Sequence, residues 1–321
     1  MIPSASFRLK HANDTLSRLP PGHTMTWPEA RHVLGPARMK RAFHRYKYAL
    51  LLLLTARQRA RLLRLLDTYP EWRQLFVATP SNFFVLFRRY LDRRHSMWQR
   101  FDSLMVDLTV AADKFGTDTM RLMAAGHGVR VGAQPGFSVD LTINRPTRIE
   151  GFWAFSLNDA DNRPLFNLSF GFTGPDSVLI ASVQGIKRHD DSAPGVIRSL
   201  TKGAHGLRPH FMLLEVFKMA CACWGIRHIR GIDSAHQVTR YKKQDDEFKF
   251  DYRAYWREHG AVQQPDGAWL LPNQTRRRTP DEMPAHKRAM YRRRYALLDA
   301  LAELVAAGLQ APAAAPEPLL G

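Results

Sequence analysis

The stretch LFNLSFGFTGPDSVLIASVQ, residues 165–184, predicts two β-strands joined by a tight turn. Residues 165–172 and 177–184 are rich in aromatic, β-branched and aliphatic side chains, whereas TGPD at 173–176 combines Gly, Pro and Asp. Because so short a connection joins only antiparallel neighbours, we expect this pair to form a hairpin.

The segments on the N-terminal side extend this hairpin into a meander. The chain turns to a β-rich pattern at Gly126-His127-Gly128, and residues 137–144 and 149–157 each predict a strand. The polar run NDADN at 158–162 is the turn signal that follows. Four antiparallel strands in sequence order are therefore predicted.

The segments on the C-terminal side predict a crossover. A polar, charged connector follows Gln184-Gly185, and Arg208-Pro209 then opens a helix that ends near residue 224, before Gly225. The other predicted elements are a strand at 226–232, a helix at 251–259, a strand at 268–271 and a helix at 283–307. The predicted fold class is α+β (mixed α/β), an antiparallel sheet that acquires a parallel crossover.

The first part of the chain is predicted to be helical. Apolar residues and arginines recur at helical spacing over 38–66, and 101–115 carries an i, i+3, i+4, i+7 apolar stripe typical of a helix that faces a core. The predicted organisation is a flexible arm at 1–26, a helical region at 27–125, an α/β domain at 126–310 and a disordered tail at 311–321.

Composition and charge narrow the class of protein. Hydrophobic residues make up 45% of the chain, which excludes a disordered protein, and 47 Lys and Arg against 29 Asp and Glu give a net charge of +18. Such an excess favours anionic partners, whether nucleic acid, acidic lipid or a phosphorylated cofactor, although arginine-rich coding bias gives the same composition. The Arg clusters at 88–89, 276–278 and 292–294 suit phosphates or anionic lipid, or form solvated helix faces.

Two negative observations bear on location and metal content. The longest apolar run, 49–54, has six residues, whereas a membrane-spanning helix needs about 20, and the N-terminus lacks an apolar core of signal-peptide length. Cys221 and Cys223 have no second Cys or His pair beside them, so we expect neither a disulfide framework nor a metal site.

The segment TKGAHGLRP, residues 201–209, is the first candidate site. Gly203 and Gly206 allow the backbone to approach an anion closely, Lys202 and Arg208 supply positive charge, and a helix N-terminus follows. These features predict binding of a phosphate or pyrophosphate, although the spacing matches neither a P-loop nor a dinucleotide fingerprint. An ordinary loop with Arg208 in a salt bridge is the alternative.

Acid–base candidates lie in two other loops and one helix. His189 stands beside two carboxylates, which suits a general base, with solvated loop charges as the alternative. Asp233 and His236 follow a strand, at the edge where α/β folds place ligands. In the helix at 251–259, Tyr252 and Tyr255 are core anchors or, alternatively, candidate proton donors.

Several of these segments together form a recognisable set: LFNLSF at 165–170, Gln184-Gly185, GLRP at 206–209, DYRAYW at 251–256 and the basic stretch 287–294. This set resembles the bacterial VirK/YbjX-like family over about residues 35–305. The resemblance implies a domain of unknown function associated with virulence and with resistance to envelope stress such as antimicrobial peptides. The family usually has Tyr-Asp-x-Phe-Trp where this chain has YRAYW after Asp251.

The order of the elements is also similar to that of the GNAT acyltransferases. In that family the loop before the central helix holds the pyrophosphate of coenzyme A or the phosphopantetheine of an acyl carrier, and a tyrosine often protonates the departing thiolate. The resemblance places cofactor contacts at Gln184, Gly185, Lys202, Gly203, Gly206 and Arg208. The family's Arg/Gln-x-x-Gly-x-Gly/Ala spacing is not reproduced, and a connector of about 20 residues precedes the loop.

The hypothesis that follows is a GNAT-like acyltransferase, or a degenerate relative, with a helical N-terminal extension. His189 or His236 would deprotonate an amine, backbone groups at 183–185 would polarise the thioester, and Tyr255 would release the thiol. A non-catalytic basic adaptor on an anionic membrane or a protein partner is the alternative, and nucleic-acid binding is a third. The expected location is cytoplasmic, with peripheral attachment to the inner membrane as an option.

Overall fold

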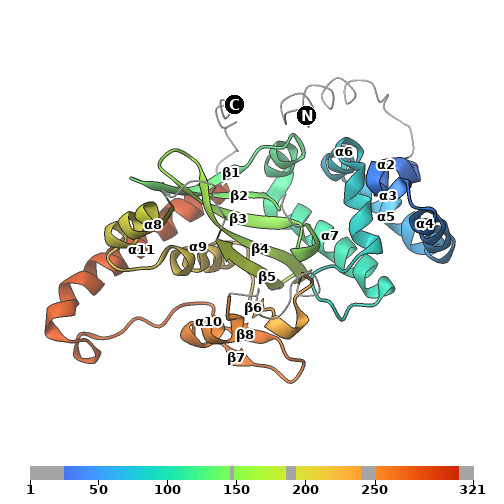
Figure 1. Ribbon diagram of the computed structural model, residues 1–321. Helices are drawn as coiled ribbons and strands as arrows, with labels where there is room; N and C mark the ends of the chain where they lie inside the picture. Colours follow the sequence, from blue (N-terminus) through green and yellow to red (C-terminus); the bar gives the residue numbers. More distant parts are fainter. Residues whose placement is uncertain (1–24, 145–147, 186–192, 240–249, 311–321) are drawn as a thin grey trace.

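The computed structural model describes residues 25–144, 148–185, 193–239 and 250–310. A twisted β-sheet stands between the helices of the first part of the chain and those of the last part (Figure 1). The predicted arm as far as residue 24 and the predicted tail at 311–321 lie outside the described residues.

Within the described residues, the sheet has eight strands in the order β1-β2-β3-β4-β5-β6-β8-β7. Every neighbouring pair is antiparallel except β5 and β6, which are parallel. The strands are β1 Val129–Gln134, β2 Phe137–Ile143, β3 Trp153–Asp159, β4 Pro164–Gly174, β5 Ser177–Gly185, β6 His228–Gly231, β7 Val262–Gln263 and β8 Trp269–Leu271. The predicted meander and parallel crossover are confirmed, and the fold is α+β.

Helices make up most of the chain before the sheet, as predicted. They are α2 Ala30–Leu34, α3 Pro36–Met39, α4 Ala42–Leu54, α5 Ala56–Thr68, α6 Pro70–Ala78, the 3₁₀ helix η1 Pro80–Phe87 and α7 Met97–Ala124. A capping box between Ser96 and Gln99 starts α7, and the predicted stripe from Phe101 to Phe115 is buried. The helices after β5 are α8 Ala193–Gly203, α9 Pro209–Cys223, α10 Tyr252–Glu258 and α11 Ala285–Gln310.

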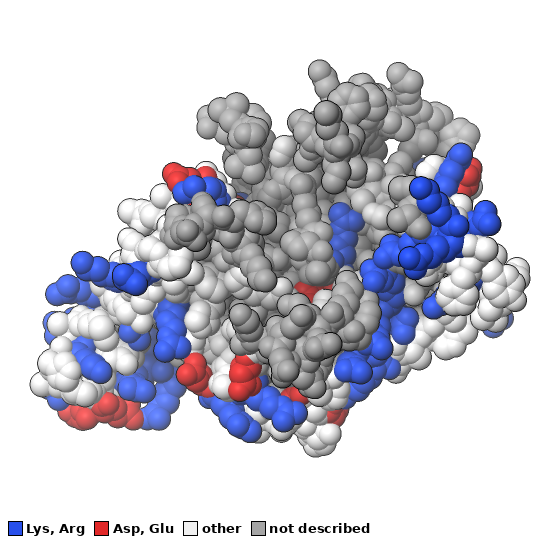
Figure 2. Space-filling view, viewed as in Figure 1, with Lys and Arg blue, Asp and Glu red and all other residues white. Residues whose placement is uncertain are grey.

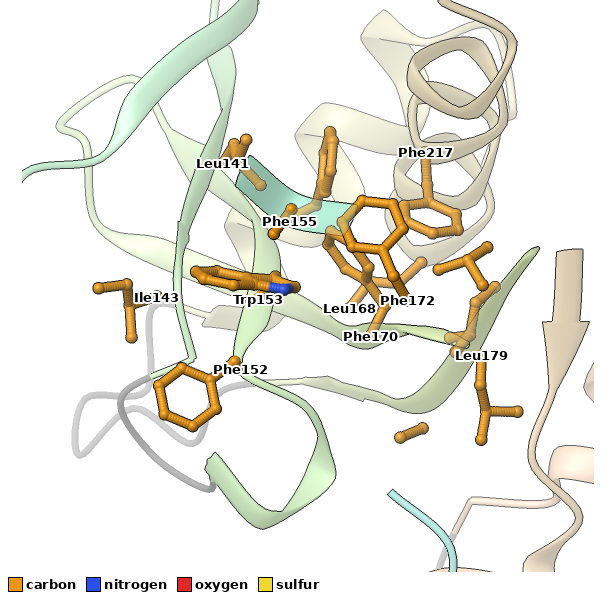
Figure 3. Packing of buried hydrophobic residues seen from close by; sticks show 14 of the residues in the cluster. Leu141, Ile143, Phe152, Trp153, Phe155, Leu168, Phe170, Phe172, Leu179 and Phe217 are labelled. Carbon is orange, nitrogen blue, oxygen red and sulfur yellow. The ribbon is translucent and has the colours of Figure 1, made fainter. Parts of the chain in front are cut away.

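The hydrophobic core joins the helical region to the sheet. Figure 3 shows Phe155 of β3, Phe170 of β4 and Phe217 of α9 packed together, with ring centroids 4.9 Å apart for Phe170 and Phe217. Trp72 of α6 lies 5.0 Å from Trp153 of β3, centroid to centroid. Side chains of residues 27–125 and 126–310 therefore share one core, and the division between these two regions stays a prediction.

Two strands and one helix occur where no regular element was expected. The expected connector after β5 contains α8, and short strands occur at β1 and β7. Pro194 and Gly195 stand in the first turn of α8, where Pro is compatible with a helix. Beyond them, Val196 and Leu200 lie one turn apart and both pack inward, which supports α8.

The parallel pair of strands positions the candidate site. Helix α9, which is apolar on most of its surface, carries the chain from β5 back to β6. Residues 177–180 of β5 pair with 228–231 of β6, and the Ile232 amide makes the last bond, 2.9 Å to the Ile180 carbonyl. Strand β5 continues to Gly185 while the chain beyond Ile232 leaves the sheet, so the two strands separate there.

No helix in the described part of the chain combines the length and apolar character needed to cross a bilayer.

Candidate functional site

A buried carboxylate, Glu150, lies where β5 and β6 separate. It ends the short 3₁₀ helix η2 (Arg148–Glu150), just before β3, and its side chain has no exposed surface. Gly151 makes this placement possible, because its φ is +107° and an added Cβ would lie 2.1 Å from the Phe170 carbonyl oxygen. Only glycine lets the chain pass this close to β4 and deliver Glu150 to the face of β5.

Four side chains of the described residues donate hydrogen bonds to the Glu150 carboxylate. The shortest come from the Thr239 hydroxyl at 2.8 Å and the Ser182 hydroxyl at 3.0 Å. The amides of Gln184 and Gln237 bind it at 3.1 and 3.3 Å. Since Gln184 is an exposed residue, the network runs from a buried carboxylate to the surface of the protein.

Tyr252 completes this site from the first turn of α10. The Asp251 carboxylate accepts hydrogen bonds from the amides of Arg253 and Ala254, which starts the helix and fixes Tyr252. The Tyr252 hydroxyl oxygen accepts from the Val183 amide at 3.1 Å and from the Gln237 amide at 3.3 Å. Burial, together with the nearby Glu150 charge, raises the pKa of Tyr252, so this phenol stays protonated.

We call the side chains of Glu150, Ser182, Gln184, Gln237, Thr239 and Tyr252 the Glu150 cluster. They come from η2, β5, the segment after β6 and α10, which meet only in the folded chain. Of this group, Gln184 was predicted as a cofactor contact and Tyr252 as an alternative proton donor. Gly185, which follows Gln184 and was also predicted as a cofactor contact, lies beside the Phe166 ring.

The predicted phosphate loop is the end of α8. The amides of residues 204–207 all donate to nearby carbonyls, and the Gly206 amide reaches back 2.8 Å to Thr201. Gly206 itself lies against the Arg294 guanidinium. The side chains of Lys202 and Arg208 are exposed, so this loop presents cations to solvent. The amides of 204–207 are hydrogen-bonded within the turn.

Gly203 has a different neighbourhood from the rest of that loop. It lines a cavity of about 500 Å³ between α8, the β1–β2 turn, the β3–β4 turn and α11. Arg208 precedes α9, and its guanidinium lies 5.7 Å from the centre of the Phe211 ring. The predicted cofactor contacts at 202–208 therefore face different surroundings from Gln184.

Tyr255, the predicted proton donor, lies one turn after Tyr252 but faces elsewhere. Its buried hydroxyl donates to the His210 carbonyl at 3.0 Å, in the first turn of α9. Burial also raises the pKa of Tyr255. The two tyrosines thus have separate partners, and only Tyr252 belongs to the Glu150 cluster.

The other predicted acid–base residues are dispersed. Asp233 is buried, and its carboxylate accepts from the guanidinium of Arg253, the indole of Trp269 and the amide of Ala235. Those donors lower the pKa of Asp233 even though burial opposes this. His236 lies in the 3₁₀ helix η3 (Ser234–His236) against Gly267, and His189 lies outside the described residues.

The described part of the chain contains no group of three or more His, Cys, Asp or Glu side chains arranged to hold a metal ion.

Sequence reasoning missed Glu150 as a functional candidate, together with three of its four donors. One signal was present, because Ser182 and Gln184 are polar residues two apart in a strand that is apolar from Val178 to Ala181. That spacing puts both on one face of β5, where they need a polar partner. The identity of the partner depends on the glycine after residue 150, which no local pattern reveals.

Comparison with known proteins gives one family and several relatives. A family model described as "Protein of unknown function (DUF535)" matches residues 37–307. A Haemophilus influenzae protein described only as uncharacterized is 28% identical over 85% of this chain and 91% of its own length. The Escherichia coli "Uncharacterized protein YbjX" is 25% identical over 82% of each chain, and the Mannheimia haemolytica "Membrane protein LapB" is 27% identical over 66% of this chain and 92% of its own. No solved structure matches.

Proposed function

The chain belongs to the DUF535 family of proteins of unknown function, as its resemblance to VirK/YbjX-like proteins predicted, and we propose that the Glu150 cluster transfers an acyl group from a thioester to an amine. The observation that carries this proposal is the pairing of a carboxylate and a protonated phenol beside the same segment of β5, just past the residues where β5 and β6 stop pairing.

In this mechanism Glu150 acts as the general base once the exposed Gln184 side chain moves aside, because the carboxylate itself has no exposed surface. A carboxylate held by several donors on fixed elements is oriented to take a proton from an incoming amine. The amine nitrogen attacks the thioester carbonyl carbon, the carbon–sulfur bond breaks, and the sulfur leaves as a thiolate. Glu150 then passes the amine proton to the sulfur, which leaves an amide, a thiol and the original carboxylate.

Tyr252 acts on the carbonyl oxygen as a hydrogen-bond donor. Its oxygen accepts from Val183 and Gln237, which polarises the O–H bond. The hydroxyl oxygen lies 3.4 Å from the Val183 carbonyl, which is long for an O–H donor. In the proposed mechanism the hydroxyl turns this proton toward the substrate carbonyl oxygen. Because its raised pKa makes it a weak acid, we assign Tyr252 to stabilising the oxyanion, and not to protonating the thiolate.

The thioester carrier would be coenzyme A or an acyl carrier. We place its thioester end at Gln184 and Val183, because both contact the proposed catalytic groups. Lys202 and Arg208, whose side chains are exposed, are the candidate cations for its phosphate, since the amides of 204–207 are hydrogen-bonded within the turn. The acceptor class, a lipid, peptide or small amine of the envelope, follows from the family resemblance.

A non-catalytic basic adaptor is the second candidate function. The net charge of +18 favours an anionic partner, and the Mannheimia haemolytica relative carries the name of a membrane protein. In this alternative the Glu150 cluster only fixes α10 and η2 against β5, and the protein contributes virulence or envelope-stress resistance by binding alone.

Release of free thiol separates these two functions. The full chain should release thiol from an acyl-CoA or an acyl-carrier thioester when an amine is supplied, and calorimetry should detect binding of the same donor. Glu150→Gln should lower the rate by about 10²-fold or more, whereas the exposed Glu258→Gln on α10 should leave it unchanged. Absence of both thiol release and donor binding with either carrier would refute the enzyme.

A further inference from the structure

Helix α4 has an unusual exposed surface. The exposed fractions of its large apolar side chains are 68% for Phe43, 71% for Tyr46, 42% for Leu50, 78% for Leu53 and 54% for Leu54. At 3.6 residues per turn these five positions fall within an arc of roughly 100° on one side of the helix. We call this surface the α4 apolar face. Contiguous apolar surface of this kind marks an interaction site more often than isolated exposed residues do.

The α4 apolar face is bordered by positive charge. Lys40, Arg41 and Arg45 are exposed at the start of the helix, and Lys47 is exposed next to the apolar arc. In Figure 2 uncharged side chains gather at the edge of the molecule where Figure 1 places α4, and a band of Lys and Arg runs beside them.

A cationic cavity opens on the neighbouring side of the same helix. It has a volume of about 370 Å³, and Arg38, Lys47, Arg88, Arg89 and Arg100 contribute to its lining. The other described lining residues are aromatic, aliphatic or histidine. Arg89 and Arg100 line this cavity together, and burial and the nearby Arg89 charge lower the pKa of Arg100.

We propose that α4 attaches the protein to an anionic lipid bilayer, with the apolar face entering the acyl boundary and the cationic cavity holding a headgroup phosphate. A basic amphipathic helix lying in the membrane surface has this division between Phe and Leu on one side and Lys and Arg on the other. Each cation near an anionic surface adds to the attraction, and the cavity adds a defined place for one phosphate.

A bilayer fits this surface better than a second copy of the chain. A symmetric contact that pairs the two α4 helices in parallel would bring the same cations of both copies face to face, which is repulsive. The helix also lies at an extremity of the molecule, as Figure 1 shows, and its large apolar side chains are exposed. Partner proteins are held mainly by side chains in pockets, whereas a bilayer accepts projecting side chains. This inference does not depend on acyl transfer.

Vesicle co-sedimentation of the full chain tests the proposal. The protein should bind vesicles of phosphatidylcholine with phosphatidylglycerol, bind phosphatidylcholine alone weakly, and lose binding as salt rises. Phe43→Ser with Leu53→Ser should weaken binding to the anionic vesicles about tenfold or more. Val262→Ser, at an apolar position 64% exposed on β7, is the matched control and should bind as the parent does.

A charge-matched pair of variants tests the basic border. Arg41→Ser with Arg45→Ser removes two exposed charges, one at the N-cap of α4 and one in its first turn, and Arg292→Ser with Arg293→Ser removes two exposed charges on α11. The first pair should weaken binding about tenfold and the second by less than about twofold. The proposal is overturned if both pairs weaken binding equally, if the apolar variant binds fully, or if the parent is a dimer that the apolar variant dissociates.

Discussion

The Tyr252 hydroxyl takes the place of a strand partner for Val183, with its oxygen 3.1 Å from the Val183 amide nitrogen. This happens just past the point where β6 stops pairing with β5. A side chain, unlike a strand, can release the amide or turn its proton without breaking a ladder. The structural bond and the proposed catalytic role of Tyr252 therefore depend on the same hydroxyl group.

Removing that hydroxyl should affect stability and activity together. Tyr252→Phe leaves the Val183 amide buried without its acceptor, so the free energy of unfolding should fall by about 1–3 kcal/mol in urea titrations. Thiol release should slow about tenfold to a hundredfold because the oxyanion loses its donor.

Tyr255→Phe is the control for Tyr252→Phe, since it removes a buried hydroxyl one turn later on the same helix. It should cost about 0.5–1.5 kcal/mol, the worth of the bond to the His210 carbonyl, and leave thiol release unchanged. Equal slowing by both variants would show that only the packing of α10 matters.

The Glu150→Gln variant tests how the cluster is held together. Glutamine replaces one acceptor oxygen by an NH₂ group, which then faces hydroxyl and amide donors. We expect the free energy of unfolding to fall by about 1–3 kcal/mol at pH 7. Glu258→Gln, exposed on α10, should change it by less than about 0.5 kcal/mol. If Glu150→Gln leaves the free energy of unfolding unchanged, the carboxylate does not organise the cluster.

Local patterns were sufficient for most of the sheet but not for α8. The hairpin at residues 165–184 is predictable because segments of strand composition and turn residues are adjacent in the sequence. The segment 193–203 contains Pro and Gly at its start, where a turn and a helix N-terminus have the same local signature. Only the packing of Val196 and Leu200 in the folded chain favours the helix.

The candidate site was harder to predict than the fold. Its members at 150, 182, 237 and 252 are separated along the chain, and no spacing rule links them. The glycines at 203 and 206 were predicted to bind an anion. His205 and Gly206 instead have positive φ and form the C-terminal end of α8. Glycines with this spacing occur both at helix ends and in phosphate-binding loops. Here the amides of 204–207 are hydrogen-bonded to nearby carbonyls, so the glycines belong to a helix end.

Asp107 should give the stability of the fold a distinctive pH dependence. This buried carboxyl of α7 accepts from the Tyr90 hydroxyl, the Trp153 indole and the Phe172 amide, yet burial raises its pKa from 3.8 to about 7. The folded protein then binds this proton more tightly than the unfolded chain. Its contribution is complete below about pH 4 and is lost as the pH rises toward 7, by up to about 1.4 kcal/mol per pH unit.

Asp107→Asn isolates that contribution, because the amide has the same shape and does not titrate. Its free energy of unfolding, measured in urea between pH 4 and pH 8, should vary less with pH than that of the parent. Asp113→Asn on the same helix, with a carboxylate side chain 72% exposed, should follow the parent curve. Parallel curves for the parent and Asp107→Asn would show that Asp107 stays ionised throughout.

Gly151 links the fold to the site most directly, since it lets the chain bring Glu150 against β5. Gly151→Ala would place a methyl group 2.1 Å from the Phe170 carbonyl oxygen at a φ of +107°. The backbone must move, so we expect a loss of about 3 kcal/mol or more of stability. Gly136→Ala is the control, because its φ of +95° is similarly strained but nothing lies within 4 Å of the added Cβ.

The difference in stability loss between these two alanine variants measures the cost of the contact with the Phe170 carbonyl oxygen, since the backbone strain is common to both. Gly136→Ala should cost about 1–2 kcal/mol and leave the Glu150 cluster intact. If Gly151→Ala retains folded protein at low temperature, that protein should release thiol more slowly, because Glu150 no longer reaches Ser182 and Gln184. Equal stability losses in the two variants, with equal thiol release, would remove Gly151 as the residue that positions the carboxylate.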